Sequence, residues 1–525
     1  MSSSAGRTAS GSAADGEVTD RVPAPVDPAG RARTTTHPVT GLVQEVADPG
    51  SWEPWDDAPS APAAGESIIT GCVRIGGRRA ALVVSDFSHL GGSVGVTAAG
   101  RLASAIDRAT WQRLPLVAMP ASGGTRMQDG TLAFLRMIDI TRLLAEHRAA
   151  GLPYLVYLRN PTTGGVLASW ASLGQLTFAE PGALVGFLGP RVHEILAPGA
   201  LPRDTQRAEN LADRGVVDGV VARAELRGVL ASVLSVLAPL EHANKRAARH
   251  PVRRPDGIGS VEDGERAGSG TMAGGRAWDA VRRTRDSARP GARELLATVS
   301  RRTVHLSGTQ GGERDAGTLL ALADIAGQPC VVVGHDRSTR RPTGPAGLRT
   351  ARRGIRLAAE LRLPLLSIVD TAGAELSSAA EEGALAGEIA RTLTDLVSLS
   401  TPTVSVLLGE GAGGTALALL PADRTVAAGN AWLAPLPPEG ASALVHRDIT
   451  HAEAMADAQH ITSADLLKAG AVDRVVDEPP DVPDDPTVFL RRLGDAIVSE
   501  LDRVTSSDPA KRLTARHSRY AHLGS

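Results

Sequence analysis

Two stretches decide the fold of this 525-residue chain: RLPLVAMPASGG at residues 113–124 and RLPLLSIVDTAG at residues 362–373. They begin 249 residues apart, and the same spacing separates Pro153 from Pro402, each at the start of another apolar run. Near the ends of the two copies, LADRGVVDGVV (from Leu211) matches LLKAGAVDRVV (from Leu466) at a spacing of 255, as a six-residue insertion would produce. Such an internal repeat predicts a tandem duplication of one domain that has since diverged.

Both copies show the same local pattern. Short runs rich in β-branched residues, ALVVSDF (81–87) and CVVVGHD (330–336), are typical of strands buried on both faces. Each run is followed by a helical stretch, 101–113 or 349–362, and then by a strand that ends in a glycine-containing loop. Repeated strand–loop–helix units predict α/β domains with right-handed crossovers.

Changes in composition divide the chain into parts. The N-terminal segment is rich in Ser, Ala, Gly and Pro, which predicts disorder. A basic and then Gly/Ser-rich segment in the middle predicts a linker. The predicted parts are a disordered tail (1–65), a first domain (66–240), a linker (241–275), a second domain (276–482) and a C-terminal helical segment (483–525). Within the tail, Trp52 and Trp55 either dock a short piece or are chance aromatic residues.

Charge and composition exclude several classes of protein. With 56 basic and 58 acidic side chains the net charge is −2, and only 3% of residues are aromatic, so we expect no nucleic-acid binding. The two cysteines, Cys72 and Cys330, are too few for a disulfide scaffold or a four-cysteine zinc ribbon. We find no apolar run of the length that a membrane helix needs and no secretory signal, so we expect a soluble, cytoplasmic protein without membrane contact.

The glycine pairs are the most informative chemical feature. Gly164–Gly165 and, 249 residues later, Gly413–Gly414 stand where a strand ends and a helix is predicted to begin. The first amides of a helix have no internal acceptor, and glycine lets a ligand approach them closely. Each copy has a second such loop one strand earlier, at Gly123–Gly124 and at Gly373–Ala374. One amide from each loop would form an oxyanion hole with two donors.

Two other motifs fit different kinds of site, a dinucleotide loop and a serine nucleophile. GEGAGG (409–414) fits a dinucleotide loop, but its repeat partner PTTGG lacks that pattern. GGSVG (91–95) fits a serine-nucleophile turn around Ser93, yet no apolar strand leads directly into it, and a flexible loop is the alternative. The 13 histidines are scattered, so we predict no metal site. Backbone amides without a side-chain nucleophile suit the stabilisation of a thioester enolate.

At this point the residues resemble a known family. The first copy resembles the β subunit of bacterial acetyl-CoA carboxylase carboxyltransferase, and the second resembles its α subunit. The matching strings in the first copy are FSHLGGSVG (87–95), ASGGTRMQDG (121–130), LPYLVYLRNPTTGGV (152–166) and AEPGALVGFLGPRV (179–192). Those in the second are GPAGLRTARRGIRLA (344–358), VDTAGAE (369–375), GEGAGGTALAL (409–419) and PPEGASAL (437–444). The similarity covers about residues 66–235 and 275–480.

The resemblance implies two tandem crotonase-like domains built of ββα units. It implies transfer of a carboxyl group from carboxybiotin, on a biotin carboxyl carrier protein, to a short acyl-CoA such as acetyl-CoA or propionyl-CoA. The resemblance also implies that the thioester oxyanion is held by amides near Gly123, Gly124, Gly164 and Gly165. The biotin carbonyl oxygen would be held by amides near Gly373, Ala374, Gly413 and Gly414. The implied substrate-binding residues are Gly91, Gly92, Thr125, Arg126 and Arg191.

For Arg126 and Arg191, salt bridges that fix the loops are the alternative to substrate binding. A separate biotin carboxylase, a homo-oligomer and a place in fatty acid biosynthesis are further implications of the resemblance. Family members place the active site between the first domain of one copy and the second domain of another.

The sequence also departs from the family pattern. The four-cysteine zinc ribbon of β subunits is absent, Asp129 stands where Glu is usual, and Arg349–Thr350 stands where Arg-Lys is usual. VHLSGTQGGERD (304–315) and DTAGAEL (370–376) replace loops of the α subunit. Two alternatives therefore stay open: a malonyl-CoA decarboxylase or transcarboxylase on the same fold, and a catalytically weakened partner subunit.

Overall fold

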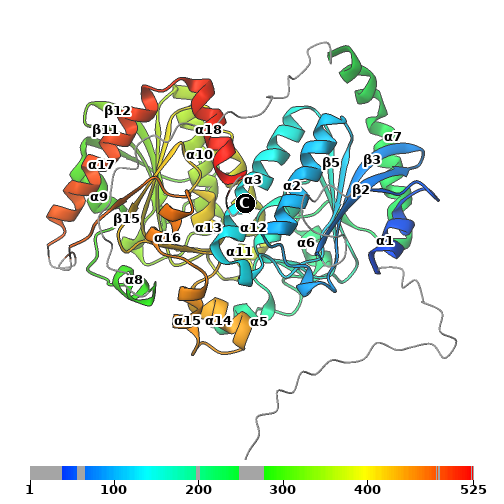
Figure 1. The fold of residues 1–525 in the computed structure, drawn as a ribbon, viewed down its shortest axis with the longest axis horizontal. Coiled ribbons are helices and arrows are strands. Elements are labelled where there is room, and N and C mark those ends of the chain that lie inside the picture. Colours follow the sequence, from blue (N-terminus) through cyan, green and yellow to red (C-terminus); the bar gives the residue numbers. More distant parts are fainter. Residues whose placement is uncertain are drawn as a thin grey trace, which may run out of the picture.

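The computed structural model describes residues 38–55, 66–196, 201–247, 277–479, 482, 485–521 and 523. Each copy of the repeat builds one β-sheet covered by helices, and the two domains lie side by side (Figure 1). The α/β architecture and the division into two similar units are as the sequence predicts.

The first domain contains a seven-stranded sheet in the order β1-β2-β3-β4-β5-β7-β9. The first three strands pair antiparallel, and from β3 onward the pairs are parallel. The strands are β1 (Glu53–Pro54), β2 (Ile68–Ile75), β3 (Arg78–Ser85), β4 (Leu116–Met119), β5 (Tyr154–Leu158), β7 (Leu176–Ala179) and β9 (Gly219–Val220). A separate small sheet pairs β6 (Thr162–Thr163) with β8 (Val185–Gly186).

The second domain repeats this topology. Its sheet runs β10-β11-β12-β13-β14-β15-β17, and β16 pairs with the far end of β14 as β8 pairs with β6. The strands are β10 (Ser300–Leu306), β11 (Thr318–Ile325), β12 (Gln328–His335), β13 (Leu365–Thr371), β14 (Thr403–Ala412), β15 (Arg424–Ala428), β16 (Trp432–Ala434) and β17 (Arg474–Val476). Even single bridges recur at the spacing of 249, since Val94 pairs with Thr125 and Thr343 with Ala374.

Helices cover the sheets because their apolar residues recur on one face. In α10, Leu348, Ala351, Ile355 and Ala358 are buried at spacings of three and four. The helices of the first domain are α1 (Pro38–Val46), α2 (Val96–Trp111), α3 (Gly130–Ala149), α4 (Gly164–Leu167), α5 (Pro190–Leu196), α6 (Ala208–Asp213) and α7 (Arg223–Ala247). Those after the linker are α8 (Ala277–Thr284), α9 (Ala292–Val299), α10 (Pro345–Leu361), α11 (Ser378–Glu382), α12 (Leu385–Val397), α13 (Gly413–Ala418), α14 (Pro438–His446), α15 (Ala452–Ala458), α16 (Ser463–Lys468), α17 (Thr487–Thr505) and α18 (Pro509–Ala521).

Elements of both domains meet at their boundary. Helix α3 of the first domain packs against α12 and α18 of the second, and the C-terminus lies between the domains in Figure 1. Thr131 Oγ1 at the start of α3 donates to Leu433 O at 3.0 Å, and Arg136 Nη1 donates to Tyr520 O at 3.0 Å. The positions of loops in one domain therefore depend on contacts from the other.

The structure differs from the predicted boundaries at two places. Helix α1 and strand β1 lie inside the segment predicted to be a disordered tail, because Trp52 packs on the core under the first sheet and Trp55 lies 4.6 Å from the Arg108 guanidinium. Helix α7 also continues to Ala247, into the predicted linker. Residues 1–37, 56–65 and 248–276, which hold the rest of the tail and linker predictions, lie outside the described residues.

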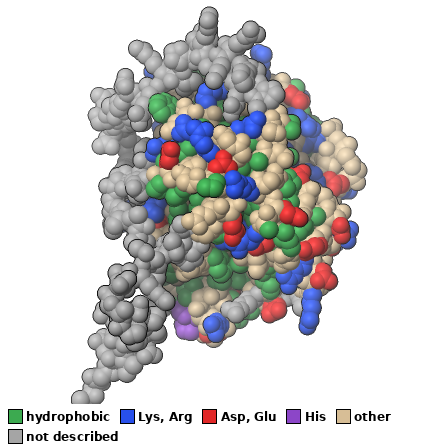
Figure 2. Space-filling model, turned by 90° about the vertical axis from the view of Figure 1, so that its right-hand side faces the viewer, with side chains coloured by type: hydrophobic (Ala, Val, Ile, Leu, Met, Phe, Trp, Pro, Cys, Tyr) green, Lys and Arg blue, Asp and Glu red, His purple; other side chains and the backbone are tan. Residues whose placement is uncertain are grey.

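The surface and the helices give two further observations. On the face shown in Figure 2, basic and acidic side chains are interspersed, with hydrophobic side chains between them. Within the described ranges, we find no helix with the length and apolar composition needed to cross a bilayer.

Candidate active site

The two glycine loops of the first domain meet at the C-terminal ends of neighbouring parallel strands. Gly123–Gly124 follows β4, and Gly164–Gly165 opens α4 after β5 and β6. Two hydrogen bonds join the segments, from Ser122 N to Pro161 O at 2.7 Å and from Thr163 N to Ser122 O at 2.9 Å. The structure thus brings together the residues that the sequence places 41 positions apart.

Glycine is required at this contact for steric reasons. A Cβ atom on Gly164 would lie 3.0 Å from the Cα of Gly124 and 3.1 Å from Gly123 O. Gly124 and Gly164 also have φ angles of +115° and +66°, which disfavour other residues. The backbones of the two loops can therefore come into contact here, because neither glycine carries a side chain that would separate them.

Three of the four glycine amides in these loops already donate hydrogen bonds to other atoms of the protein. Gly123 N donates to Gly91 O at 2.9 Å, Gly124 N to Ser122 Oγ at 3.0 Å and Gly164 N to Phe187 O at 2.9 Å. These three N–H groups hold the loops together. Gly165 N, in the first turn of α4, has no acceptor within its own helix.

Thr125 lies directly beside Gly165. A Cβ atom on Gly165 would be 2.3 Å from Thr125 Oγ1 and 3.7 Å from Thr125 N. Thr125 is buried, and its Oγ1 has no hydrogen-bond partner among the residues that the structure describes. Thr125 and Gly165 are therefore the best-placed donors in this loop pair.

The remaining predicted residues of the first domain support these loops from behind. A Cβ on Gly92 would lie 2.0 Å from Ala121 O, while Gly91 O accepts the bond from Gly123. Arg126 is buried and pairs with Glu66, and its Nη2 donates to Ser93 O at 3.0 Å. This placement matches the loop-fixing alternative for Arg126. Arg191 lies in α5, but its side chain is outside the described part of the structure.

The second domain repeats the loop geometry. Gly373 N donates to Thr371 Oγ1 at 3.1 Å, as Gly124 N does to Ser122 Oγ in the first domain. Gly413 opens α13 with φ +69°, close to the +66° of Gly164. The positions equivalent to Thr125 and Gly165 are Ala374 and Gly414, 249 residues later in each case.

These loops line two adjoining cavities. Gly123, Thr125, Gly164 and Gly165 line the first cavity, of about 560 Å³, together with Gly414. Gly373, Ala374 and Gly413 line the second cavity, of about 1130 Å³. Phe187, Leu188 and Leu436 belong to the walls of both cavities.

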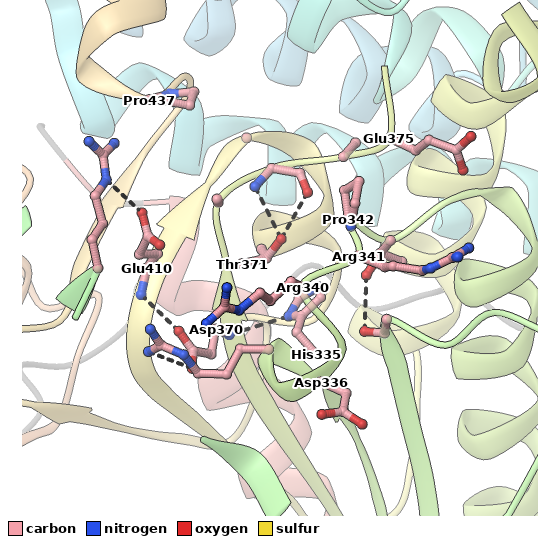
Figure 3. Close-up of a pocket in the computed structure, with 18 of the residues that line it drawn as sticks. His335, Asp336, Arg340, Arg341, Pro342, Asp370, Thr371, Glu375, Glu410 and Pro437 are labelled. Carbon is pink, nitrogen blue, oxygen red and sulfur yellow. Dashed lines mark hydrogen bonds and ion pairs between the residues drawn. The ribbon is translucent and has the colours of Figure 1, made fainter. Parts of the chain in front are cut away.

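The second cavity also holds a charged cluster (Figure 3). Asp370 Oδ2 is 3.3 Å from Arg337 Nη1, and Glu410 Oε2 is 3.1 Å from Arg285 Nε. Glu410 N also donates to Asp370 Oδ1 at 3.1 Å. Burial raises the pKa of both the Asp370 and Glu410 carboxyls, while the arginines oppose that shift. Burial also lowers the pKa of the adjacent His335 to about 4, so this ring is neutral at pH 7.

Sequence reasoning did not single out this cluster. Asp370 stands in the quoted VDTAGAE string and Glu410 in GEGAGG, so their positions at strand ends were visible. Their partners Arg285 and Arg337 come from segments far away in the chain, which only the fold brings near. Arg349, at a departure from the family pattern, pairs instead with Glu313 at 2.7 Å and Glu388 at 3.3 Å.

Ser93, at the centre of the GGSVG motif, contacts an arginine in the described part of the chain. Ser93 Oγ lies 3.5 Å from Arg126 Nε, in the loop-supporting network described above. Across the described residues, no group of three or more His, Cys, Asp or Glu side chains is arranged to hold a metal ion.

Comparison with known proteins identifies a family model and several relatives that this chain matches. Residues 261–524 match the family model described as acetyl co-enzyme A carboxylase carboxyltransferase-like. A Mycobacterium tuberculosis H37Rv protein named "Probable biotin-dependent acyl-coenzyme A carboxylase beta3 subunit" is 50% identical over 503 residues, which cover 92% of this chain and 98% of that protein. A Salinispora arenicola protein named "Acetyl-coenzyme A carboxylase carboxyl transferase subunits beta/alpha" is 36% identical over 472 residues, which cover 87% of this chain and 82% of that protein.

Among solved structures, a transcarboxylase 12S crystal structure with methylmalonyl-coenzyme A bound aligns with a TM-score of 0.37 and 19% identity. The alignment covers 90% of this chain and 89% of that chain. On the sequence matches, the chain belongs to the carboxyltransferase family of biotin-dependent acyl-CoA carboxylases.

Proposed function

We propose that this chain transfers a carboxyl group from carboxybiotin, on a separate carrier protein, to the α-carbon of a short acyl-CoA. Acetyl-CoA would give malonyl-CoA, a precursor in fatty acid biosynthesis. Propionyl-CoA would give methylmalonyl-CoA. We propose that it acts in the cytoplasm as a homo-oligomer, with a biotin carboxylase and a biotin carboxyl carrier protein as partners. In this proposal both halves of the site come from one chain, where the two cavities adjoin, and not from two copies as the resemblance implies.

The first-domain loops would bind the thioester. Loss of the α-proton places negative charge on the carbonyl oxygen, which N–H donors stabilise. Thr125 and Gly165 come from the two touching loops and line the first cavity, so their N–H groups are the proposed donors. Each donor of this kind typically contributes about 2.7–4 kcal/mol to transition-state stabilisation.

The second-domain loops would receive the biotin ring. Carboxybiotin supplies the carboxyl group and, once free of it, a ureido nitrogen that can accept the α-proton. By position in the repeat, Ala374 N and Gly414 N are equivalent to Thr125 N and Gly165 N; Ala374 lines the second cavity, whereas Gly414 lines the first. A Cβ built on Gly373 meets no atom within 4 Å, so the backbone here has open space for a ring. Apolar side chains such as Phe187 and Leu436 would exclude water.

The observation that carries the proposal is the duplication of this backbone geometry. Both copies place two glycine loops at parallel strand ends, and the four loops line adjoining cavities. A reaction with an anionic oxygen on each of two substrates needs such a pair of sites. Buried acidic and basic side chains, Asp370 and Arg337 among them, surround the second site.

An acyl-CoA panel tests the proposal. Malonyl-CoA and methylmalonyl-CoA are incubated with the purified full chain, with and without biocytin as acceptor, and the products are followed by mass spectrometry. We expect acetyl-CoA or propionyl-CoA to form only when biocytin is present. Release of CO₂ without biocytin would support a decarboxylase instead, and no reaction under either condition would contradict both. Light scattering on the same preparation checks the oligomer.

A further inference from the structure

A buried carboxylate crosses the domain boundary close to both cavities. Glu381, in α11 of the second domain, is only 8% exposed. Its Oε1 and Oε2 accept hydrogen bonds from Phe187 N at 2.9 and 3.0 Å, and Oε1 accepts another from Gln206 Nε2 at 2.7 Å. Leu188 N is a further donor to this carboxylate. The donors all belong to the first domain.

The segment that Glu381 holds is the wall shared by the two cavities. Phe187 and Leu188 line both of them. Phe187 O accepts the hydrogen bond from Gly164 N at 2.9 Å, so one residue connects the Glu381 carboxylate to the first glycine pair. On its other side, the Phe187 ring lies 3.4 Å from the position of a Cβ on Gly414 in the second pair. A shift of Phe187 would therefore displace both the Gly164–Gly165 pair and the Gly413–Gly414 pair.

Stability alone does not explain a carboxylate at this place. Burial raises the pKa of Glu381, while the hydrogen bonds from Phe187, Gln206 and Leu188 oppose this shift. Among the ion pairs of the described residues, none includes Glu381, whereas its neighbour Glu382 pairs with Arg214 at 3.0 Å. A buried carboxyl group without a cation is costly, and here the N–H groups of Phe187 and Gln206 from the other domain satisfy it.

We propose that Glu381 is a positioning residue, through which the second domain fixes Phe187 and thereby the Gly164–Gly165 amides of the first domain. The inference rests on the proposed function, because it concerns the geometry of that same site. It makes the oxyanion-binding loop of one domain dependent on a single carboxylate from the other. The acyl half of the reaction is then competent only when the two domains are correctly docked.

The test compares Glu381→Gln with Glu382→Gln, which makes the same chemical change at the next residue. The glutamine NH₂ at position 381 would face converging donors, whereas Glu382 lies at the rim with its side chain 26% exposed. Carboxyl transfer to biocytin, acyl-CoA affinity by calorimetry and melting temperature are measured for the full chain.

We expect kcat of Glu381→Gln to fall at least about tenfold, with the dissociation constant of acyl-CoA within about threefold of wild type, because donor alignment matters most in the transition state. Glu382→Gln should retain kcat within about twofold. An equal loss in both variants, or a wild-type kcat in Glu381→Gln, would overturn the inference.

Gln206→Met gives a second readout if Glu381→Gln does not fold. It keeps the carboxylate but removes two hydrogen bonds of Gln206 Nε2, one to Glu381 Oε1 at 2.7 Å and one to Leu188 O of the wall segment at 2.8 Å. We therefore expect kcat to fall by about threefold or more, and an unchanged kcat would overturn the inference. A wild-type protein without any transfer would overturn the proposed function and this inference together.

Discussion

At Gly164 the absence of one carbon atom lets two loops touch. The α-carbons of Gly124 and Gly164 leave no room for a side chain, and this contact sets Gly165 N beside Thr125. The contact is a property of the backbone, so the usual search for catalytic side chains does not find it. Its sequence signal is the glycine pattern at strand ends, repeated 249 residues later.

Gly164→Ala should abolish transfer. The new Cβ at 3.0 Å from Gly124 Cα would push the loops apart, and the φ of +66° adds about 1–2 kcal/mol of backbone strain. We expect transfer to fall at least about 100-fold, as for loss of one oxyanion donor. Gly189→Ala is the control, because Gly189 lines the same cavity and a Cβ there meets nothing within 4 Å. Equal activity of the two folded variants would contradict the role of Gly164.

The residues of the site were only partly predictable. All eight glycine and alanine positions expected from the motifs lie in the loops around the cavities or directly behind them. Gly124 N is used within its own loop, by Ser122 Oγ. The sequence could not show that Gly123 N and Gly164 N are used inside the loops, because their acceptors, Gly91 O and Phe187 O, come from other segments. For the same reason Glu381 was not predicted, since its donors lie in the other domain.

At the scale of single elements, α3 shows how the helix ends are fixed. His147 in its last turn is buried between α2 and the start of β5, with Nδ1 2.9 Å from Thr110 Oγ1 and Nε2 3.2 Å from Pro153 O. Burial lowers the pKa of His147 to about 4. The folded protein therefore keeps this ring neutral at pH values where the unfolded chain protonates it.

His147→Gln should change the pH dependence of stability. Between pH 6.5 and 4 only unfolded His147 takes up a proton, so the unfolding free energy of wild type falls as pH falls through that window. Relative to the variant, we expect wild type to lose about 2 kcal/mol between pH 6.5 and 5, measured by urea unfolding. His460→Gln, at a side chain that is 78% exposed, should follow wild type. Parallel curves for wild type and His147→Gln would contradict this prediction.

The elements with the strongest local signal were predictable, and the missed helix α1 shows why others were not. The apolar runs at 81–87 and 330–336 fall on β3 and β12, since strands buried on both faces carry a strong local signal. Helix α1 was missed because its order comes from contacts with α7 and from the docked Trp52, not from local propensity. Composition alone cannot report contacts of that kind.

At the scale of the whole molecule, the duplication is the organising feature. The tandem repeat of one α/β domain could be predicted from one spacing in the sequence, whereas the strand order of its sheets comes from the structure. The docking of the domains could not, because α18 returns from the end of the chain to pack on α3. That docking brings Phe187 of the first domain against Gly414 of the second.

The duplication predicts that each copy serves its own substrate in one reaction. Gly413 is the counterpart of Gly164 and lines the second cavity, where the nearest atom to an added Cβ would be Pro435 O at 3.7 Å. An alanine there would place a methyl group in the cavity without a clash, and the φ of +69° adds about 1–2 kcal/mol of backbone strain, as at Gly164. The acyl-CoA site in the first domain would be left intact.

Carboxyl transfer and acyl-CoA affinity of Gly413→Ala therefore test the assignment of one glycine-loop pair to each substrate. It predicts that transfer to biocytin falls at least about 100-fold, while the dissociation constant of acyl-CoA stays within about twofold of wild type. A folded Gly413→Ala protein that transfers carboxyl groups at the wild-type rate would contradict it.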